Sequence, residues 1–397
     1  MFIHRKIRIV LLLVGLCGEL AAQKVPLLTL IDSALKKAVL QYQYLGTQLA
    51  PDVLPKTYYP LTKKFETSGS RWWTSGFYPG SLLYLYEYSH DTALLKEEKR
   101  VEKIIEKEQF NKGTHDLGFM MYCSFGAANR LNPSREYEQV LMNSARSLST
   151  RFNATAGVIK SWDHGAWKYP VIIDNMMNLE LLFWATRFSG DSSFYKIAVT
   201  HANTTLKNHY RADNSSWHVV DYDISDGHVI SKKTHQGYAD YSAWARGQAW
   251  GLYGYVVMYR CTRDPQYLVH AQKIARFITT HPSMPEDKIP YWDYHSPEIP
   301  ATCRDASAAA ITASALLELS RYTTATQSNA YKDFAEKVLR SLASPTYTAP
   351  YGENGGFILK HSTGHLPGNS EVDVPLTYAD YYYIEAMLRY KAMQQKN

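Results

Sequence analysis

Apolar and polar positions follow a pattern that recurs along the chain. In each copy, a nearly all-apolar stretch leads through a short polar break into a stretch whose apolar residues recur at helical spacing between charged ones. A helix that is apolar all round is buried, whereas a helix with one apolar stripe faces water on its other side. Each copy therefore predicts an inner helix paired with an outer helix, and the copies span 81–106, 125–152, 179–207, 253–281 and 313–343.

The polar breaks and the chain ends complete this pattern. Asp91, Asp191 and Asp264 stand in the breaks, where aspartate favours turns and helix starts. Residues 27–44 and 381–393 have the pattern of terminal helices, which extends the five visible pairs to six. A closed ring of such pairs is an all-α, double-layered (α/α)6 barrel, and this is the fold that the pattern predicts.

Two long segments, 203–243 and 282–303, interrupt the repeats. No run of residues shows convincingly the strict alternation that is typical of half-buried strands. We therefore predict that both segments are loop-like. Long connections in a compact domain are often functional, so these two are candidates for carrying part of a site.

Composition and charge narrow the class of ligand. The chain has 397 residues, 45% of them hydrophobic, which suffices for a large core. Its formal charge is +6 and no lysine or arginine run stands out, which argues against a nucleic-acid partner. The 31 tyrosines and 9 tryptophans are amphipathic side chains suited to stacking on sugar rings. Composition therefore favours a carbohydrate ligand.

The first residues have the features of a secretory signal. A basic start, an apolar stretch and small residues at Ala21–Ala22 predict a signal peptide over 1–22 and a mature barrel domain over 23–397. The expected location is outside the cytoplasm, in the bacterial periplasm. No later segment reads as transmembrane, so no membrane insertion is expected after cleavage, and the oligomeric state is left open. Three mature cysteines form no disulfide framework and are interpreted as small buried side chains: Cys123, Cys261 and Cys303.

The residues that open the inner helices are expected to meet. Inner helices of such a ring run parallel, so their N-termini gather at one end of the barrel. Acids, an arginine and tryptophans at one rim predict a sugar-binding cleft with ionisable groups. The converging residues are Trp72, Trp73, Asp116, Asp174, Trp244, Arg246, Gln248, Trp250, Arg304 and Asp305.

Each of these acids could instead be an ordinary helix cap. Aspartate is a favoured N-cap, and the helix dipole favours its charge there, which predicts a lowered pKa. For Asp305, which precedes a long alanine-rich stretch, the cap is the better interpretation. Asp174 and Asp116 have apolar neighbours instead, which would desolvate the carboxyl group and raise its pKa, as a general acid requires.

Four motifs in order carry a family resemblance. They read THDLGF, IIDNMMNLELLFWA, KTHQGYADYSAWARGQAWGLYG and CRDASAAAITASALLEL. Together they resemble the unsaturated glucuronyl hydrolases, glycoside hydrolase family 88, over most of the mature chain. The resemblance implies the same (α/α)6 barrel. It also implies an enzyme that removes a 4,5-unsaturated uronic acid from the non-reducing end of oligosaccharides released by polysaccharide lyases, with glycosaminoglycan disaccharides as the leading substrates.

Carried over residue by residue, the resemblance assigns roles. Asp174 would be the proton donor and water activator, protonating C4 of the substrate's double bond before water adds at C5. Asp116 would be the second acid, which keeps the proton on Asp174 by charge repulsion or positions water. Trp73 and Trp250 would stack on the unsaturated ring. The residues expected to bind the substrate's polar groups, or to lie beside them, are His218, Gln236, Arg246 and Trp244.

Other interpretations of these residues remain open at this stage. Trp73 and Trp250 could be core residues, and His218 could be a structural histidine in a short strand. Arg246, expected to bind the substrate's carboxylate, could be paired with Asp240 instead. The histidines show no metal-ligand spacing and no phosphate-binding loop is visible, so neither a metal nor a cofactor is predicted.

Two other functions fit parts of the pattern. An unsaturated rhamnogalacturonyl hydrolase, acting on pectin fragments, has a similar barrel and chemistry. A non-catalytic oligosaccharide-binding protein would keep the tryptophans but would not need both Asp116 and Asp174.

Overall fold

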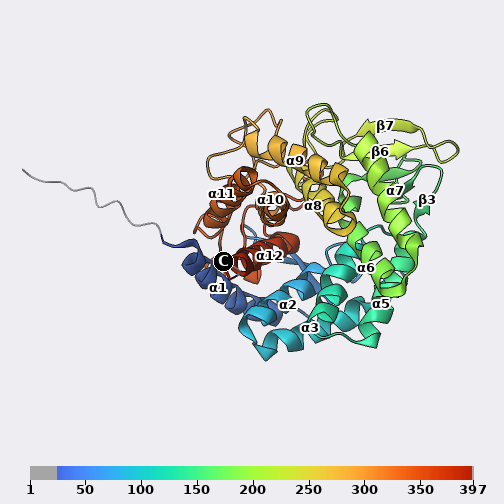
Figure 1. The fold of residues 1–397 in the computed structure, drawn as a ribbon. Coiled ribbons are helices and arrows are strands. Elements are labelled where there is room, and N and C mark those ends of the chain that lie inside the picture. The colour runs from blue at the N-terminus through green and yellow to red at the C-terminus, as the bar shows by residue number, and fades with distance from the viewer. Residues whose placement is uncertain (1–24, 396–397) are drawn as a thin grey trace, which may run out of the picture.

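The helices form two concentric rings in a computed structural model, which describes residues 25–395 (Figure 1). The expected signal peptide, 1–22, lies outside the described residues. The inner ring runs in order through α2 (Phe77–Ser89), η2 (Gly118–Gly126) with α4 (Ala127–Leu131), α6 (Leu179–Ser189), α8 (Ala245–Thr262), α10 (Ala306–Leu319) and α12 (Thr377–Gln394). Contact of α12 with α2 closes the ring.

The outer ring consists of the helices that alternate with these in sequence. They are α1 (Leu27–Thr47), α3 (Thr92–Ile105), α5 (Arg135–Ser149), α7 (Ser192–Asn208), α9 (Pro265–Thr280) and α11 (Ala325–Leu342). The predicted (α/α)6 barrel is confirmed. The predicted difference between buried inner helices and outer helices with one buried stripe is also confirmed. Every residue of α10 is buried, whereas α3 buries Leu94, Glu98, Val101 and Ile105, one stripe at helical spacing.

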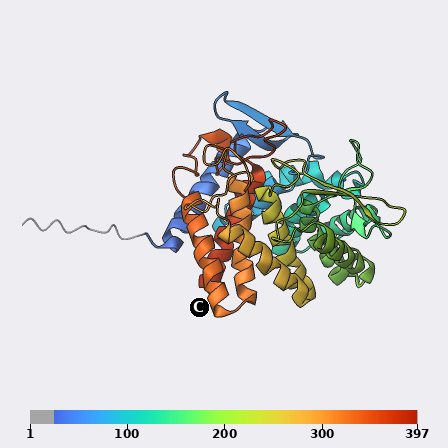
Figure 2. The ribbon, with the colours of Figure 1, turned by 90° about the horizontal axis from the view of Figure 1, so that it is seen from above.

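Short and long connections lie at opposite ends of the barrel. Inner helices pass to outer ones through tight breaks, where Asp91, Asp191 and Asp264 cap the next helix as predicted and accept from the N–H of the second following residue at 2.8–2.9 Å. The return connections from outer to inner helices are all long. Figure 2 shows the tight turns at one end and the loops and strands at the other. The N-termini of the inner helices therefore open into a thick layer of loops.

Strands in this layer correct the expectation that the segment 203–243 is loop-like, whereas the segment 282–303 contains no helix or strand, as expected. β6 (Val219–Tyr222) pairs antiparallel with β5 (Pro170–Ile172) and with β7 (Val229–Lys233). All four residues of β6 are buried, so the alternation that would reveal a strand is absent from its sequence. The segment 203–243 thus contains the end of α7 and two strands of a sheet.

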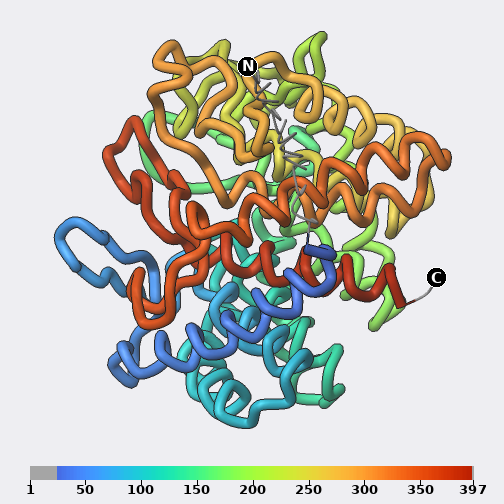
Figure 3. The backbone as a smooth tube through the Cα atoms, turned by 90° about the vertical axis from the view of Figure 1, so that its left-hand side faces the viewer, coloured from blue at the N-terminus to red at the C-terminus, as the bar shows by residue number. Residues whose placement is uncertain are grey.

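Two further hairpins complete the described strands. β1 (Leu54–Tyr59) and β2 (Lys64–Ser68) form an antiparallel pair that projects beside the loop before α12 (Figure 3). β3 (Phe152–Asn153) and β4 (Val158–Ile159) form a short pair after α5. Single turns η1 (Glu106–Phe110), η3 (Ile173–Asn178), η4 (Ser320–Tyr322) and η5 (Asn354–Gly356) fill the remaining connections. Within residues 25–395, none of the helices combines the length and hydropathy needed to cross a bilayer.

Candidate active site

Asp174 is positioned by the junction of strand and helix. β5 leads into the turn η3, which precedes α6, and Asp174 is the second residue of that turn. The backbone N–H of Ile173 donates to the carbonyl oxygen of His218 at 3.1 Å, which extends the pairing of β5 with β6. The sheet therefore brings His218 beside Asp174, although 44 positions separate them in the sequence.

The carboxyl group of Asp174 is not a helix cap. Residue 178 stands at the N-cap of α6, and neither η3 nor α6 has a side-chain cap. The side chain is 7% exposed, and its Oδ1 is buried without a hydrogen-bond partner among the described residues. Burial raises the pKa of Asp174 to about 7, against the positive charge of Arg246 and with the support of the negative charge of Asp116. This carboxyl group can hold or release a proton near neutral pH.

The segment that carries Asp116 is bonded to the segment that carries Asp174. The N–H of Phe119 donates to Oδ1 of Asn178 at 2.9 Å, which ties the start of η2 to the start of α6. A Cβ atom on Gly118 would lie 2.4 Å from Cα of Asn178, so only glycine permits this approach. The amide of Asn178 and the missing side chain of Gly118 thus hold the two acid-bearing segments together.

The ring of His115 faces the carboxylate of Asp116. Nδ1 of His115 lies 2.8 Å from the carbonyl oxygen of Ser161, which can only accept, so Nδ1 carries a hydrogen. Burial lowers the pKa of His115, which favours a neutral ring with a lone pair on Nε2. That Nε2 lies 3.2 Å from Oδ1 of Asp116. Nε2 has no hydrogen-bond partner among the described residues, so the ring faces Asp116 without bonding to it.

Arg246 has a different partner from the one considered in the sequence. Its guanidinium group pairs with Asp305 at 3.1 Å, and both side chains are fully buried. Asp240 pairs with Lys233 at 3.0 Å, so the pairing with Arg246 is wrong. Asp305 also accepts from the N–H groups of Ser307 and Ala308, and its predicted role as the cap of α10 is confirmed.

The loop before α12 accepts further hydrogen bonds from the guanidinium group of Arg246. The Nη atoms of Arg246 donate to the carbonyl oxygens of Thr363 and Gly364. Its Nε is buried without a partner in the described part of the chain. Nη1 uses both of its N–H groups on Asp305 and Thr363, so the N–H groups left for a substrate carboxylate are that of Nε and the second one of Nη2.

His218 and Gln236 are linked to one another and to this loop. Nδ1 of His218 accepts from the N–H groups of His235 and Gln236, both at 3.1 Å, so the hydrogen of the neutral ring is on Nε2. Burial holds the pKa of His218 well below its usual range, and its Nε2 has no partner within residues 25–395. The side-chain amide of Gln236 donates to Gly364 at 3.0 Å. His218, directly before the strand β6, thus offers one N–H donor that no described residue uses.

Three tryptophans line the region in different ways. Trp244 lies between His218 and Arg246, with both groups 4.5 Å from its ring. Trp73 is half-buried and packs on Phe119, whereas Trp72 turns away beneath Lys56 of β1. Trp73 therefore packs among the inner segments and Trp72 does not, and the stacking of Trp73 on a substrate stays a prediction.

Trp250 presents no surface to solvent. It is 0% exposed and packs on Phe119, with ring centroids 4.9 Å apart. This burial favours the alternative that Trp250 is a core residue. Its stacking on a substrate remains a prediction that requires movement of the side chains above it.

Sequence reasoning missed the contribution of the segment before and within α12. Tyr378 packs against Trp73, with centroids 4.9 Å apart, and lies 5.2 Å from the guanidinium carbon of Arg246. Thr363 and Gly364 hold Arg246 and Gln236, as described above. The dense run of tyrosines that starts at residue 378 could have indicated this contribution, but the sequence pattern predicted only a terminal helix there. Among residues 25–395, no group of three or more histidine, cysteine or acidic side chains is placed to hold a metal ion.

Comparisons with known proteins identify close relatives, although no family model matches the chain. An unsaturated glucuronyl hydrolase of Formosa agariphila is 46% identical over 344 residues, which is 86% of this chain and 82% of the relative. A solved unsaturated glucuronyl hydrolase specific for heparin superposes with a TM-score of 0.90 at 47% identity, over 92% of this chain and 98% of its own.

A third relative comes from Streptococcus agalactiae. A variant of its unsaturated glucuronyl hydrolase, solved in complex with dGlcA-GalNAc6S, has a TM-score of 0.78 and 28% identity over 91% of each chain.

Proposed function

This chain belongs to the family of unsaturated glucuronyl hydrolases, and from that premise we propose that it removes 4,5-unsaturated uronic acid from oligosaccharides cut by polysaccharide lyases. The observation that carries the proposal is the carboxyl group of Asp174, buried, with a pKa of about 7 and an unpartnered Oδ1. A group that is protonated in part of the molecules near neutral pH can serve as a general acid there. The proposed substrate class is glycosaminoglycan disaccharides, which the heparin specificity of one solved relative and the dGlcA-GalNAc6S complex of another support.

The reaction begins with the double bond between C4 and C5 of the unsaturated ring. The carboxylic acid of Asp174 gives its proton to C4, and positive charge develops at C5, where the ring oxygen shares it. The resulting Asp174 carboxylate accepts a proton from water while the water oxygen bonds to C5. The hemiketal then opens: the bond from C5 to the ring oxygen breaks, C5 becomes a ketone, and the former ring oxygen becomes a hydroxyl group on C1. The C1 hemiacetal collapses to an aldehyde as the bond from C1 to the glycosidic oxygen breaks, and the remaining sugar takes the proton and leaves as an alcohol.

The neighbours of Asp174 set when it is protonated. The negative charge of Asp116 raises the pKa of Asp174, and the positive charge of Arg246 lowers it. When Asp174 has given up its proton, Arg246 stabilises the new carboxylate. The hydroxyl group of Thr114 donates to Oδ2 of Asp116 at 2.9 Å, and Nε2 of His115 lies 3.2 Å from its Oδ1. The free Nε2–H of His218 is a donor for a polar atom of the substrate.

The proposal is tested with purified protein and a panel of unsaturated disaccharides. We expect loss of the absorbance of the conjugated double bond with disaccharides from heparin, chondroitin or hyaluronan. A pectin-derived unsaturated disaccharide serves as the contrasting substrate. Turnover of the pectin product alone would make the chain an unsaturated rhamnogalacturonyl hydrolase. Tight binding of all substrates without turnover would make it a binding protein.

The location of the protein is a separate part of the proposal. The signal-like character of residues 1–22 supports export to the bacterial periplasm. Mass spectrometry of protein from a fractionated bacterial host is expected to find a mature N-terminus near residue 23 in the periplasmic fraction. A full-length chain in the cytoplasmic fraction would contradict export.

A further inference from the structure

A large cavity lies behind the two acids, on the side of the barrel away from the loops. It has a volume of about 870 Å3 and extends from Gly118 and Met177 to Gln395 at the end of α12. Its walls come from α2, η2, α4, α6, α8 and α12. The volume lies within the range of about 300–1,000 Å3 that is usual for small-molecule sites. Close-packed protein interiors leave few voids larger than a water molecule, so this space holds either water or a ligand.

The charged side chains that line the cavity are all paired: six of them with one another, and Lys391 with Asp32 outside the wall. Three ion pairs line it: Glu87 with Arg130 at 2.7 Å, Glu180 with Arg260 at 2.7 Å, and Glu385 with Arg389 at 3.2 Å. Glu318 contacts Arg260 and Arg389 from behind, at 3.4 and 2.8 Å. A charged ligand would find no unpaired counter-ion among these groups. The cavity is therefore suited to a neutral ligand.

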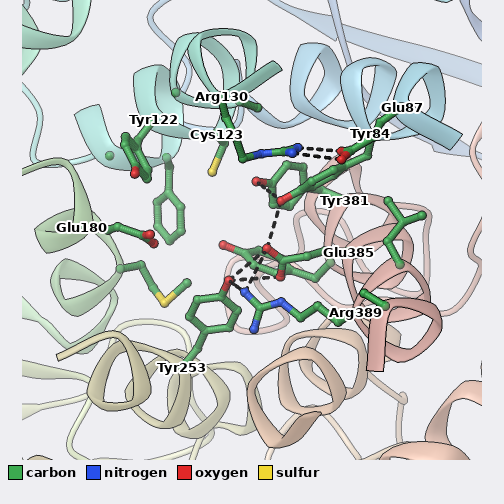
Figure 4. A pocket seen from close by; sticks show the side chains of 18 of the residues that line it. Tyr84, Glu87, Tyr122, Cys123, Arg130, Glu180, Tyr253, Tyr381, Glu385 and Arg389 are labelled. Atoms are coloured by element: carbon green, nitrogen blue, oxygen red, sulfur yellow. Dashed lines mark hydrogen bonds and ion pairs between the residues drawn. The ribbon is translucent and has the colours of Figure 1, made fainter. Parts of the chain in front are cut away.

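Hydroxyl groups and carboxylates converge on one wall of the cavity. The hydroxyl groups of Tyr84 and Tyr253 each donate to Oε1 of Glu385 at 3.0 Å, and Arg389 donates to the hydroxyl of Tyr253 at 2.6 Å. Figure 4 shows this network facing Glu180 and Tyr122 across the open space. The tyrosine O–H groups are used within the network, so what it offers to the hydroxyl groups of a ligand is acceptor oxygens and the remaining N–H groups of the arginine.

Aromatic faces complete the lining. Trp184 of α6 lines the cavity and is half-buried, with its ring stacked on Phe188 at 5.0 Å. Phe119 lines the inner end, where its other contacts are Trp73 and Trp250. Flat aromatic surfaces beside paired polar groups are the features that recognise a sugar ring, which has an apolar face and a polar edge.

We propose that this cavity is a second saccharide site, which binds a neutral mono- or disaccharide at the end of the barrel opposite Asp174. The site is separate from the one that performs the proposed reaction. Its ligand is an uncharged sugar, which lacks the carboxylate of a uronic acid. The proposal rests on the lining residues alone and does not depend on the hydrolase activity.

The test measures sugar binding to the mature protein by titration calorimetry and ligand-observed NMR. Glucose and N-acetylglucosamine are the neutral probes, and glucuronate and glucosamine are the charged ones. We expect saturable binding of a neutral probe, with Kd about tenfold weaker in Trp184→Ala and weaker in Glu180→Gln. Trp73→Ala, at the other end, serves as the matched aromatic control and is expected to leave this Kd unchanged. Thermal denaturation verifies that each variant is folded.

Each other outcome overturns the proposal. Absence of saturable binding of either neutral probe would mean that the cavity holds only water. Preference for glucuronate or glucosamine would contradict the paired charges. Binding that survives in Trp184→Ala and is lost in Trp73→Ala would place the sugar at the loop end. Turnover of unsaturated disaccharides by Trp184→Ala is measured separately and should be retained, so failure of the second site is distinguishable from failure of the proposed enzyme.

Discussion

The regions around Asp174 and Asp380 place the same group, a buried aspartate, in two different settings. Burial raises the pKa of each to about 7. Asp380, in the first turn of α12, accepts from the N–H groups of Ile358 and Leu359 at 2.9 and 2.8 Å and from the hydroxyl of Tyr42 at 3.3 Å. Asp174 leaves its buried Oδ1 without a partner. A raised pKa therefore does not by itself identify a catalytic acid, and the unpaired oxygen distinguishes the two.

The two neighbourhoods differ in what the carboxyl group connects. Asp380 fixes the loop that contains η5 to the start of α12, so its bonds stabilise the frame of the barrel. Asp174 is surrounded by charges, Asp116 and Arg246, that change its proton affinity without bonding to it. Substitution of each aspartate by asparagine keeps the shape and removes the charge. The pair of variants thus separates a structural from a catalytic carboxyl group.

The largest expected effect is on turnover. Asp174→Asn removes the proton that C4 receives, and we expect kcat to fall by about 10³-fold, within the usual range for a general acid. Asp380→Asn should keep kcat within about threefold, because no reacting atom is near it. Loss of the double-bond absorbance of an unsaturated disaccharide is the measurement. Near-normal turnover by Asp174→Asn would reject the assignment of the donor.

The stability of the same two variants is expected to change in the opposite order, with the larger loss in Asp380→Asn. The amide of Asp380→Asn cannot accept both backbone N–H groups, so we expect the free energy of unfolding to fall by about 1–3 kcal/mol. Asp174→Asn should leave it unchanged or raise it, since an unpartnered buried carboxyl group is removed. Urea denaturation followed by circular dichroism measures both. Equal destabilisation by the two variants would show that Asp174 also has a structural role.

The pH dependence of stability sharpens the comparison. The pKa of each carboxyl group is about 7 in the folded protein against an ordinary value of 3.8. Between these values the folded state holds a proton that the unfolded chain has released, so the free energy of unfolding falls as pH rises from about 4 to about 7. Each asparagine variant should flatten this dependence. Denaturation at a series of pH values measures the slope, and a slope unchanged in both variants would contradict the raised pKa values.

A smaller effect on turnover is expected at His115. His115→Asn keeps a donor for the carbonyl of Ser161 and removes the Nε2 that faces Asp116. We expect kcat to fall by about tenfold, with KM little changed, because Asp116 loses orientation while the substrate contacts remain. Steady-state kinetics gives both constants. An increase in KM alone would mean that His115 acts on binding instead.

The smallest expected effect is a shift in the pH profile of kcat in the Asp116→Asn variant. Because the charge of Asp116 raises the pKa of Asp174, Asp116→Asn should move the alkaline limb of kcat to lower pH. The wild-type limb is expected near pH 7, since activity is lost as Asp174 ionises. The comparison uses kcat measured from pH 5 to 9, where lysines and arginines keep their charge. A limb at the same pH in both proteins would show that Asp174 does not sense Asp116.

Much of the candidate site could be predicted because the acids stand next to the starts of inner helices. Once the helix pairs close into a ring, Asp116 and Asp174 must lie at one end of it. The contacts around them could not be predicted in the same way. Arg246 meets Asp305 and not Asp240, since both residues start neighbouring inner helices, whereas Asp240 lies in the loop before α8. Proximity in the sequence favoured the wrong partner.

The sequence by itself determined the helical pairs, their inner and outer faces and the caps at Asp91, Asp191 and Asp264, because these depend on residues within a few positions of one another. It also determined that two aspartates lie among apolar neighbours. Only the tertiary structure decided which oxygen atoms remain unpaired, that β6 brings His218 to Asp174, and that the loop at Gly364 occupies the fork of Arg246. Those features depend on segments far apart in the chain, whose hydrogen bonds form only when the ring closes.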